Sequence, residues 1–399
     1  MRSSFNPDNL TPENTPSKQA FCKARKKVNA TAFTAINKLA VDSYYETLNT
    51  GFDRFFRLRL LAVDGSSIRL EEEAYADMIN SHQDLDLDLQ QCRKSDQAPL
   101  ARTSLIYDVL NEIAIDAQLK PTVFSELEIL ASQLSKTGPN DVLVMDRGYH
   151  CYWFVALLEK LNIKFVIRAQ TSQKPIRDFI KNGEEDGLVT LNKPAKMTTS
   201  PRHKALIDEA DLETIKSLNL RLVRYVSIDQ NEEAVTYVML TNLIDSTNYP
   251  KEGFRKLYKA RWKVEEAFKT YKVSVEIERW SGLSWKSALQ DFHSTILLTN
   301  MTRIFSFEVE DKIRTKSHER VQKGELKYKE KLNITEAVRS FRILVRNIIK
   351  VAKFEGQKHL QGFCKSIKIF KTLIRDDRNF PHDRKNNHAR FNMNCKSSF

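Results

Sequence analysis

Short apolar runs that alternate with helical segments constrain the fold of this chain more than any other feature. The predicted strands are residues 58–63, 142–145 and 165–168, and the predicted helices between them are 125–135 and 152–161. Strands that alternate with helices are typical of an α/β core. Two of these strands end at an aspartate, Asp64 and Asp146, so the pattern also predicts where acidic side chains stand in the fold.

Local patterns predict the rest of the first 170 residues. A helical region at 17–45 has Ser17 as its N-cap. A second short strand is expected at 68–70, and 105–117 alternates well enough for one strand. The polar stretch 71–99 has no clear period, so we expect a long loop there.

The pattern changes after residue 169. Residues 169–242 are predicted to form an inserted β-rich segment, in which strands 218–228 and 234–240 are joined by a hairpin at 229–232. A long helix is expected at 250–272, basic helices from Trp285 onward, and a poorly ordered tail beyond Asn379.

Composition excludes several classes of protein. Of 399 residues 41% are hydrophobic and 29% are charged, which excludes fibrous and low-complexity chains. Apolar runs fall short of the roughly 18 residues of a membrane span, and a secretory signal is not readable, so we expect a cytoplasmic protein. Five widely spaced cysteines without a CxxC pair argue against a disulfide framework or a thiolate metal site.

The excess positive charge is concentrated in the last quarter of the chain. Residues 301–399 hold 24 Lys and Arg and 11 Asp and Glu, a net charge of +13, whereas residues 1–300 are neutral overall. A polyanion such as DNA suits this distribution, although a solvated basic face would also explain it. Near the N-terminus a second basic group that could touch phosphates comprises Lys18, Lys23, Arg25, Lys26 and Lys27.

Each of the two aspartates has a structural and a functional interpretation. Asp64 is followed by Gly65, and Asp-Gly between apolar runs is a strong hairpin-turn signal. Asp146 follows a buried run, and strand ends of this kind carry ligand sites in α/β proteins as well as ordinary turns. Arg147 adjoins Asp146 and is expected either to pair with a carboxylate or to reach a phosphate.

The predicted helix 250–272 places four polar residues on one face. At 100° per residue Tyr258, Arg261, Glu265 and Lys272 fall within about 60° of one another, beside an apolar stripe. One interpretation is a satisfied charge cluster. The other joins Asp64, Asp146 and Glu265 as ligands of two Mg²⁺ or Mn²⁺ ions about 4 Å apart, with the three other residues binding DNA phosphates.

The spacing Tyr258-x2-Arg261-x3-Glu265-x6-Lys272 resembles the Tyr-Arg-Glu-Lys signature of DDE transposases of the insertion sequence four family. The segments LLAVDGSSIRL and VLVMDRGYH, which contain the two aspartates, are similar to that family's first and second Asp motifs. Further resemblance lies in KQAFCKARKKV, YVMLTNL and SALQDFHSTILLTNM, so that it covers roughly residues 18 to 310.

The resemblance implies an α/β, RNase H-like mixed-sheet core with a β-rich insertion and flanking N- and C-terminal helices. Asp64, Asp146 and Glu265 are then the metal-binding triad. The implied regions are an N-terminal helical DNA-contacting region (1–56), the first part of the core (57–168), the insertion (169–242), the catalytic helix and end of the core (243–310) and a basic helical C-terminal region with a polar tail (311–399).

The implied activity is cut-and-paste DNA transposition. Similar enzymes cut at the inverted-repeat ends of an insertion sequence, often through a hairpin intermediate, and join the 3′-ends to target DNA as a dimer. We therefore expect DNA as the partner, two Mg²⁺ or Mn²⁺ ions as cofactors, a homodimer in the DNA complex, and a cytoplasmic, nucleoid-associated protein without a membrane partner.

Differences between this sequence and the family leave two alternatives to a complete transposase open. The region before Asp64 is shorter than in fuller relatives, so a truncated or domesticated copy that binds DNA without cutting is one alternative, and a standalone RNase H-like nuclease is the other. Some relatives stack a flipped base on a Trp in the insertion, where this chain offers Tyr225 or Tyr237 instead, although core packing is the more expected role of both tyrosines. Trp262 and Trp280 are expected to be packing residues, and a structural role is expected for His150.

Overall fold

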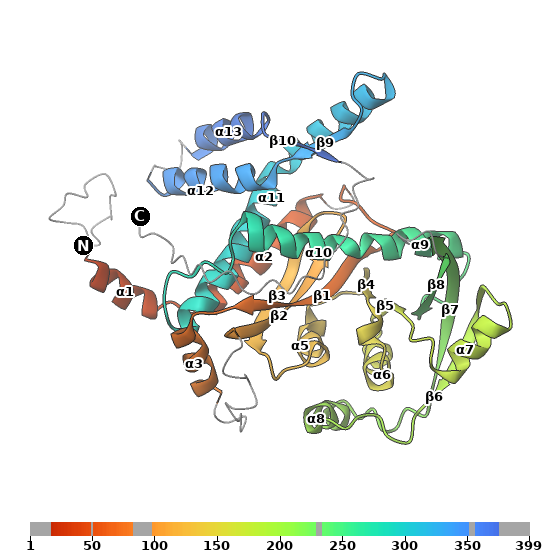
Figure 1. Cartoon of the computed structure of the whole chain (residues 1–399). Helices are drawn as coiled ribbons and strands as arrows, with labels where there is room; N and C mark the ends of the chain where they lie inside the picture. Colours follow the sequence, from red (N-terminus) through yellow and green to blue (C-terminus); the bar gives the residue numbers. More distant parts are fainter. Residues whose placement is uncertain (1–16, 49–50, 83–97, 229–233, 351–355, 375–399) are drawn as a thin grey trace. The chain divides into compact units, whose positions relative to one another are not determined.

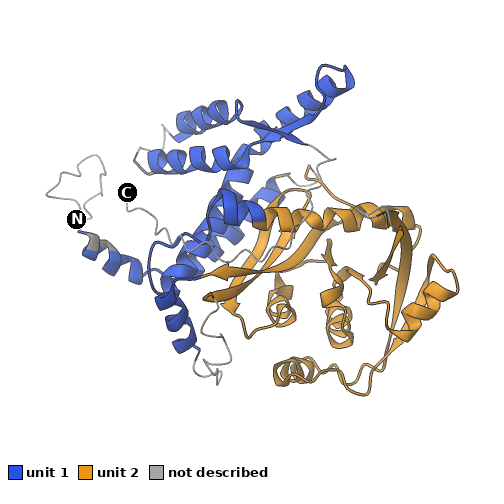
Figure 2. Cartoon of the chain, in the orientation of Figure 1, with its two compact units in different colours: residues 1–47, 70–85, 269–399 blue, residues 48–69, 86–268 orange. Residues whose placement is uncertain are grey.

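The computed structural model describes residues 17–48, 51–82, 98–228, 234–350 and 356–374. The chain forms two compact units, which Figure 2 shows in different colours. Unit 1 comprises residues 1–47, 70–85 and 269–399, and unit 2 comprises residues 48–69 and 86–268. Unit 2 contains both predicted aspartates and Glu265, whereas Lys272 belongs to unit 1.

Unit 2 is built on one mixed sheet, ordered β3-β2-β1-β4-β5-β8-β7-β6 within the described residues (Figure 1). The strands are β1 (Arg59–Arg69), β2 (Leu100–Asp108), β3 (Ile113–Pro121), β4 (Asp141–Met145), β5 (Lys164–Arg168), β6 (Asp186–Asn192), β7 (Ser217–Ile228) and β8 (Ala234–Thr241). The first three strands are antiparallel neighbours, and β4 and β5 run parallel to β1. This order and these directions confirm the expected α/β, RNase H-like core.

Helices cover both faces of this sheet (Figure 1). α5 (Glu126–Gln133) and α6 (Tyr152–Lys160) lie on one face, and α9 (Lys251–Ala260) and α10 (Trp262–Lys269) lie on the other. Successive side chains of a strand point to opposite faces. On β1, Leu61 and Val63 therefore pack in the cluster with α5 and α6, while the equally buried Leu60 and Ala62 point toward α9 and α10.

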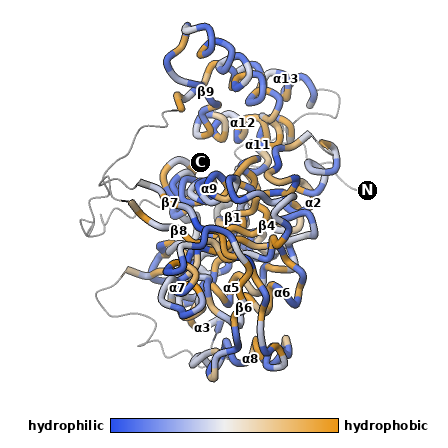
Figure 3. The backbone as a smooth tube through the Cα atoms, turned by 90° about the vertical axis from the view of Figure 1, so that its right-hand side faces the viewer, coloured by the Kyte–Doolittle hydropathy of each residue, from blue (hydrophilic) through white to orange (hydrophobic). Residues whose placement is uncertain are grey.

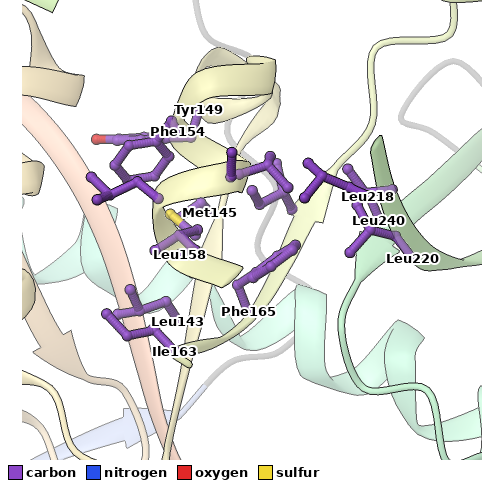
Figure 4. Close-up of a cluster of buried hydrophobic side chains, with 14 of the residues drawn as sticks. Leu143, Met145, Tyr149, Phe154, Leu158, Ile163, Phe165, Leu218, Leu220 and Leu240 are labelled. Atoms are coloured by element: carbon purple, nitrogen blue, oxygen red, sulfur yellow. The ribbon is translucent and has the colours of Figure 1, made fainter. Parts of the chain in front are cut away.

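The strands of the sheet are rich in apolar residues because α6 packs against them and buries their side chains. α6 buries most of its side chains against β4, β5 and β8, and Figure 4 shows Phe154 and Leu158 beside Leu143 and Phe165. β1 and β4 are accordingly among the most hydrophobic parts of the backbone (Figure 3). At about 25 cal/mol per Å² of buried apolar surface, such side chains contribute about 1.5–3 kcal/mol each. α5 begins with a capping box, in which Ser125 and Glu128 satisfy each other's backbone amides.

The hairpin-turn interpretation of Asp64 and Gly65 is wrong. β1 continues unbroken through both residues, because β2 pairs with them in register, Asp64 opposite Leu105 and Gly65 opposite Ser104. The two predicted strands at 58–63 and 68–70 are therefore one strand.

The prediction of a single strand at 105–117 is also wrong. The chain turns after Asp108, whose carboxylate accepts the amides of Leu110 and Asn111, and Glu112 has a positive φ of 57°. The turn splits the segment into β2 and β3. An aspartate that binds the amides two and three residues on is an ordinary turn signal.

The β-rich segment continues the central sheet. β8 pairs antiparallel with β5, with Ile167 opposite Leu240, and β7 and β6 follow outward. α7 (Lys174–Lys181) and α8 (Pro201–Glu209) connect these strands. β7 and β8 are antiparallel partners, while the hairpin predicted at 229–232 lies outside the described residues.

Unit 1 is mainly helical. Its helices are α1 (Lys18–Lys26), α2 (Thr31–Leu48), α3 (Glu72–Asn80), α11 (Trp285–Gln322), α12 (Ile334–Lys350) and α13 (Gly356–Ile367), and β9 (Lys329–Leu332) pairs with β10 (Lys371–Ile374). A separate small core joins α11, α12 and α13 around Phe341 and Phe363. The basic helices predicted after Trp285 are present, but the β9–β10 pair was not foreseen, and residues beyond 374 are not described.

Two sequence predictions in unit 1 need correction. The predicted loop 71–99 contains α3, which buries Tyr75 and Met78. The predicted helix at 17–45 is interrupted between α1 and α2, although Ser17 does cap α1 by accepting the Ala20 amide.

Arg25 of the basic N-terminal group is held by α11. Its guanidinium donates to Asp291 at 3.0 Å and to Gln290 at 2.8 Å, so it fixes α1 in place instead of facing a phosphate. In the part of the chain that the structure describes, helices long and apolar enough to cross a membrane are absent.

Candidate active site

The two aspartates lie on neighbouring parallel segments, Asp64 within β1 and Asp146 directly after the last residue of β4. β1 and β4 pair with Leu60 opposite Val142 and Ala62 opposite Val144. Continuing this register by two residues sets Asp64 level with Asp146, and neighbouring strands are about 4.8 Å apart. Both residues have the parity of Ala62 and Val144, so their side chains point to the face that α9 and α10 cover.

Asp64 is held in a poorly solvated position. Its Oδ1 accepts the Gly65 amide at 3.0 Å, and its side chain is 21% exposed. Burial raises the pKa of Asp64 to about 6; the Arg261 cation opposes this shift, and the Glu265 carboxylate adds to it. Asp64 and Glu265 are therefore close enough to influence each other electrostatically.

Asp146 caps a short 3-10 turn, Arg147–Tyr149. Its Oδ1 accepts the Gly148 amide at 2.8 Å, which fixes the carboxylate at the end of β4. Desolvation of the buried hydroxyl raises the pKa of Tyr149, and the charges of Glu126, Asp64 and Asp146 raise it further. Both aspartates therefore lie close enough to the Tyr149 hydroxyl to influence its pKa.

Glu265 enters the site from α10. α9 and α10 follow one another through Arg261, which keeps right-handed helical dihedrals, as the sequence predicts for one long helix. The Arg261 guanidinium donates to Glu265 at 2.7 Å and lies 3.9 Å from Asp64. It also lies 5.8 Å from the Tyr258 ring, so the predicted shared face is present for Tyr258, Arg261 and Glu265.

Lys272 is placed differently from the other three helix residues. It lies in a π-helical turn, Thr270–Ser274, in which the 100° spacing of an α-helix no longer holds, and it belongs to unit 1. Its membership of the site therefore stays a prediction.

Glu126 is a fourth carboxylate that sequence reasoning missed. A Cβ on Gly65 would lie 2.4 Å from the Glu126 Cδ, so the side chain of this α5 residue rests on the Gly65 backbone. The Tyr149 hydroxyl donates to Glu126 at 3.3 Å, and the Glu126 charge contributes to the raised pKa of Asp64. Gly65 was the sequence feature that could have indicated this close contact, because a glycine leaves room for a neighbouring side chain. The hairpin-turn interpretation explained the glycine in another way.

A pocket of about 300 Å³ adjoins the Asp146 carboxylate. It is lined by Asp146, Arg147, Arg168, Tyr237, Tyr258, Arg261 and Trp262. Arg168 and Trp262 were not predicted as site residues, and the packing prediction for Trp262 is wrong, because it is 53% exposed and lies 5.1 Å from the Arg261 guanidinium. Trp280 is buried, as predicted.

Arg147 and Arg168 also line a second pocket of about 520 Å³, together with Gln170, Thr171 and Ser172. Among the described residues, neither arginine makes an ion pair. The guanidinium of Arg168 lies 4.5 Å above the Tyr237 ring. Two cations therefore face the space beside Asp146.

The structure shows where the two tyrosines of the insertion and His150 lie relative to the pockets. Tyr237 and Tyr225 are stacked, with ring centroids 5.3 Å apart, and Tyr237 also lines the smaller pocket. His150 is buried and its Nδ1 accepts the Gln170 amide at 2.8 Å, which agrees with the predicted structural role. Burial lowers the pKa of His150 to about 4, so the ring is neutral at physiological pH.

The three predicted ligands have the chemical type that a hard divalent cation requires. Asp64, Asp146 and Glu265 offer carboxylate oxygens, the ligands that Mg²⁺ and Mn²⁺ prefer. Within the described residues, however, groups of three or more His, Cys, Asp or Glu side chains placed to share a metal ion are absent. Arg261 stands between Glu265 and Asp64, and its guanidinium occupies one Glu265 oxygen, Oε1.

Fold and site together define a class of protein. An RNase H-like sheet that sets two aspartates level on neighbouring parallel strands, under a helix with a glutamate and an arginine, is the core of a nucleic-acid-processing enzyme. The family follows from comparison with known proteins: a family model described as a transposase DDE domain matches residues 56–301. This is well over half of the chain, which therefore belongs to the DDE transposase family. A comparison with curated proteins finds no match.

Proposed function

We propose that this protein is a cut-and-paste transposase of the insertion sequence four family. It cuts DNA at the inverted-repeat ends of an insertion sequence and joins the freed 3′-ends to target DNA. The observation that carries the proposal is the arrangement of Asp64, Asp146 and Glu265, in which the strand register aligns the aspartates and Arg261 links Glu265 to Asp64.

Asp64, Asp146 and Glu265 would hold two Mg²⁺ or Mn²⁺ ions. When bound, the ions lower the pKa of an attacking water or 3′-hydroxyl and stabilise the leaving oxygen at phosphorus. The raised pKa of Asp64 favours this role, because a bound cation compensates the cost of keeping this poorly solvated carboxylate charged.

The arginines and tyrosines beside Asp146 would position the DNA strand. Arg261 lines the pocket beside Asp146, where its guanidinium would donate to a phosphate oxygen; its Nε is buried, and the described residues provide it with no hydrogen-bond acceptor. Arg147 and Arg168 add charge on the same side, since both line the pocket next to Asp146. Tyr258 and Tyr237 border the same pocket and would contact the sugar or base.

Further parts of the proposal concern the assembly, the location and Lys272. Joining two ends to one target requires two active sites held together, so we propose a homodimer in the DNA complex. We also propose that the protein acts on chromosomal DNA in the cytoplasm and that Lys272 contributes a phosphate contact.

The test is metal-dependent cleavage of a plasmid that carries the gene with its native flanks. The wild-type protein is compared with Glu265→Gln in Mg²⁺ and in Mn²⁺, and Glu266→Gln, which is exposed on the same helix, is the matched control. Cuts at the ends of the element that vanish in Glu265→Gln and persist in Glu266→Gln support the proposal.

The other outcomes identify the alternatives. DNA binding without metal-dependent cleavage indicates a copy that binds DNA without cutting. Cleavage of DNA without preference for the element's ends, and without joined products, indicates a nuclease.

A further inference from the structure

α12 has one face in a core and the other in solvent. Its buried residues Ala337, Val338, Phe341 and Leu344 recur at helical spacing. Ala337, Phe341 and Leu344 pack with Phe363 of α13. In Figure 1, α12 and α13 run beside each other. The orientation of α12 is therefore fixed by apolar burial, and its opposite face is fixed with it.

That opposite face is basic. Arg339, Arg342 and Arg346 are exposed, and at 100° per residue they fall within about 60° of one another, on the side opposite Phe341. Ile343, 54% exposed, lies next to them. We call Arg339, Arg342 and Arg346 the α12 arginine face.

Little acidic charge offsets the α12 arginine face. Arg339 pairs with Glu336 at 2.7 Å and is still 67% exposed. For Arg342 and Arg346 the described residues provide no carboxylate partner. On α11, by contrast, Lys312 pairs with Glu308 and Arg314 with Glu310.

The sequence around α12 has the same bias. Residues 329–374 contain eleven Lys and Arg against three Asp and Glu. A cationic patch of this kind repels itself in water and lowers that cost by binding a polyanion. From Arg339 to Arg346 the helix rises about 10 Å, so the three guanidinium groups are spread over about two helical turns.

We propose that the α12 arginine face binds the phosphate backbone of duplex DNA. It is a second DNA-binding surface, separate in sequence and in unit from the carboxylate site. Guanidinium groups suit this role, because each can donate two parallel hydrogen bonds to one phosphate. The inference rests on the proposed function only in taking DNA as the substrate.

The test measures affinity of the full chain for a linear DNA duplex across a salt series, with EDTA present so that cutting plays no part. Arg342→Gln/Arg346→Gln is compared with Lys312→Gln/Lys316→Gln, which removes the same charge from exposed positions on α11. All four positions are on the surface, and equal melting temperatures verify that both variants fold.

We expect the α12 variant to bind about tenfold or more weakly near 0.15 M salt, and its slope of log K against log salt to fall by about 2, because each lost phosphate contact is worth about 0.9. The α11 variant should keep the wild-type slope. Equal slopes in the wild type and the α12 variant overturn the proposal and leave an acidic protein or an anionic membrane as the partner of this face.

Failure of this inference and failure of the proposed function give different results. If the α12 variant loses affinity but the wild type does not cut its plasmid, the surface stands and the catalytic proposal fails. If the wild type cuts at the element's ends and the α12 variant binds DNA with the wild-type slope, the catalytic proposal stands and the surface fails.

Discussion

The guanidinium of Arg261 donates a hydrogen bond to Glu265 at 2.7 Å, one helical turn along the same face. It also lies 3.9 Å from Asp64, so a single arginine offsets two carboxylates that otherwise repel each other. The Arg261 side chain is 7% exposed, so water screens its electrostatic interactions and hydrogen bonds less than those of a surface ion pair.

Arg261→Ala is expected to weaken both DNA binding and DNA cutting. The substitution removes a phosphate donor and leaves Asp64 and Glu265 without their shared cation, which should also cost about 1–3 kcal/mol of stability. Urea denaturation and DNA-binding titrations measure the two effects separately. Unchanged binding together with unchanged cutting would contradict this role.

Asp146→Asn should abolish cutting while it leaves most of the DNA affinity. The change removes one proposed metal ligand and keeps the shape of the side chain, and it does not remove a phosphate donor. Strand cleavage and gel-shift measurements on the same preparation give both quantities. Cutting at the wild-type rate would rule out Asp146 as a ligand.

Stability should depend on the charge of Asp64. Burial raises the pKa of this carboxyl from 3.8 to about 6, so the folded protein holds the proton more tightly than the unfolded chain does. The resulting stabilisation is fully present below pH 4 and is lost as the pH rises through 6. Asp64→Asn cannot ionise, so its free energy of unfolding should exceed that of the wild type by about 1–3 kcal/mol at pH 8 and by less at pH 5. Denaturation with a chelator present checks this, and a difference that does not change with pH would refute it.

Gly65→Ala should cost about 1–2 kcal/mol, because the new methyl group overlaps the Glu126 side chain. The displaced Glu126 also loses its hydrogen bond from Tyr149. In a Glu126→Ala background the same change at Gly65 should cost less, since the obstruction is gone. A double-mutant cycle in urea measures the coupling, and equal costs in the two backgrounds would show that the contact is unimportant.

Sequence patterns correctly located the helices and strands whose formation is determined by the residues within them. The apolar run before Asp146 is β4, and the apolar segment after it is α6, because burial of a continuous apolar stretch requires no knowledge of its partner. The Arg261–Glu265 pair followed from helical spacing alone, since residues four apart share a face. The α/β class and the order of the acidic residues along the chain were likewise readable.

Tertiary structure decided what depends on pairing between distant segments. Asp64 and Gly65 have local turn chemistry, yet they lie within a strand because β2, about forty residues further along the chain, supplies their hydrogen-bond partners. The alignment of Asp64 with Asp146 comes from the register of β1 on β4, and Arg168 joins the site only because β5 is the next strand. Hydrophobic periodicity specifies the buried face of an element, whereas backbone pairing and packing select its neighbour.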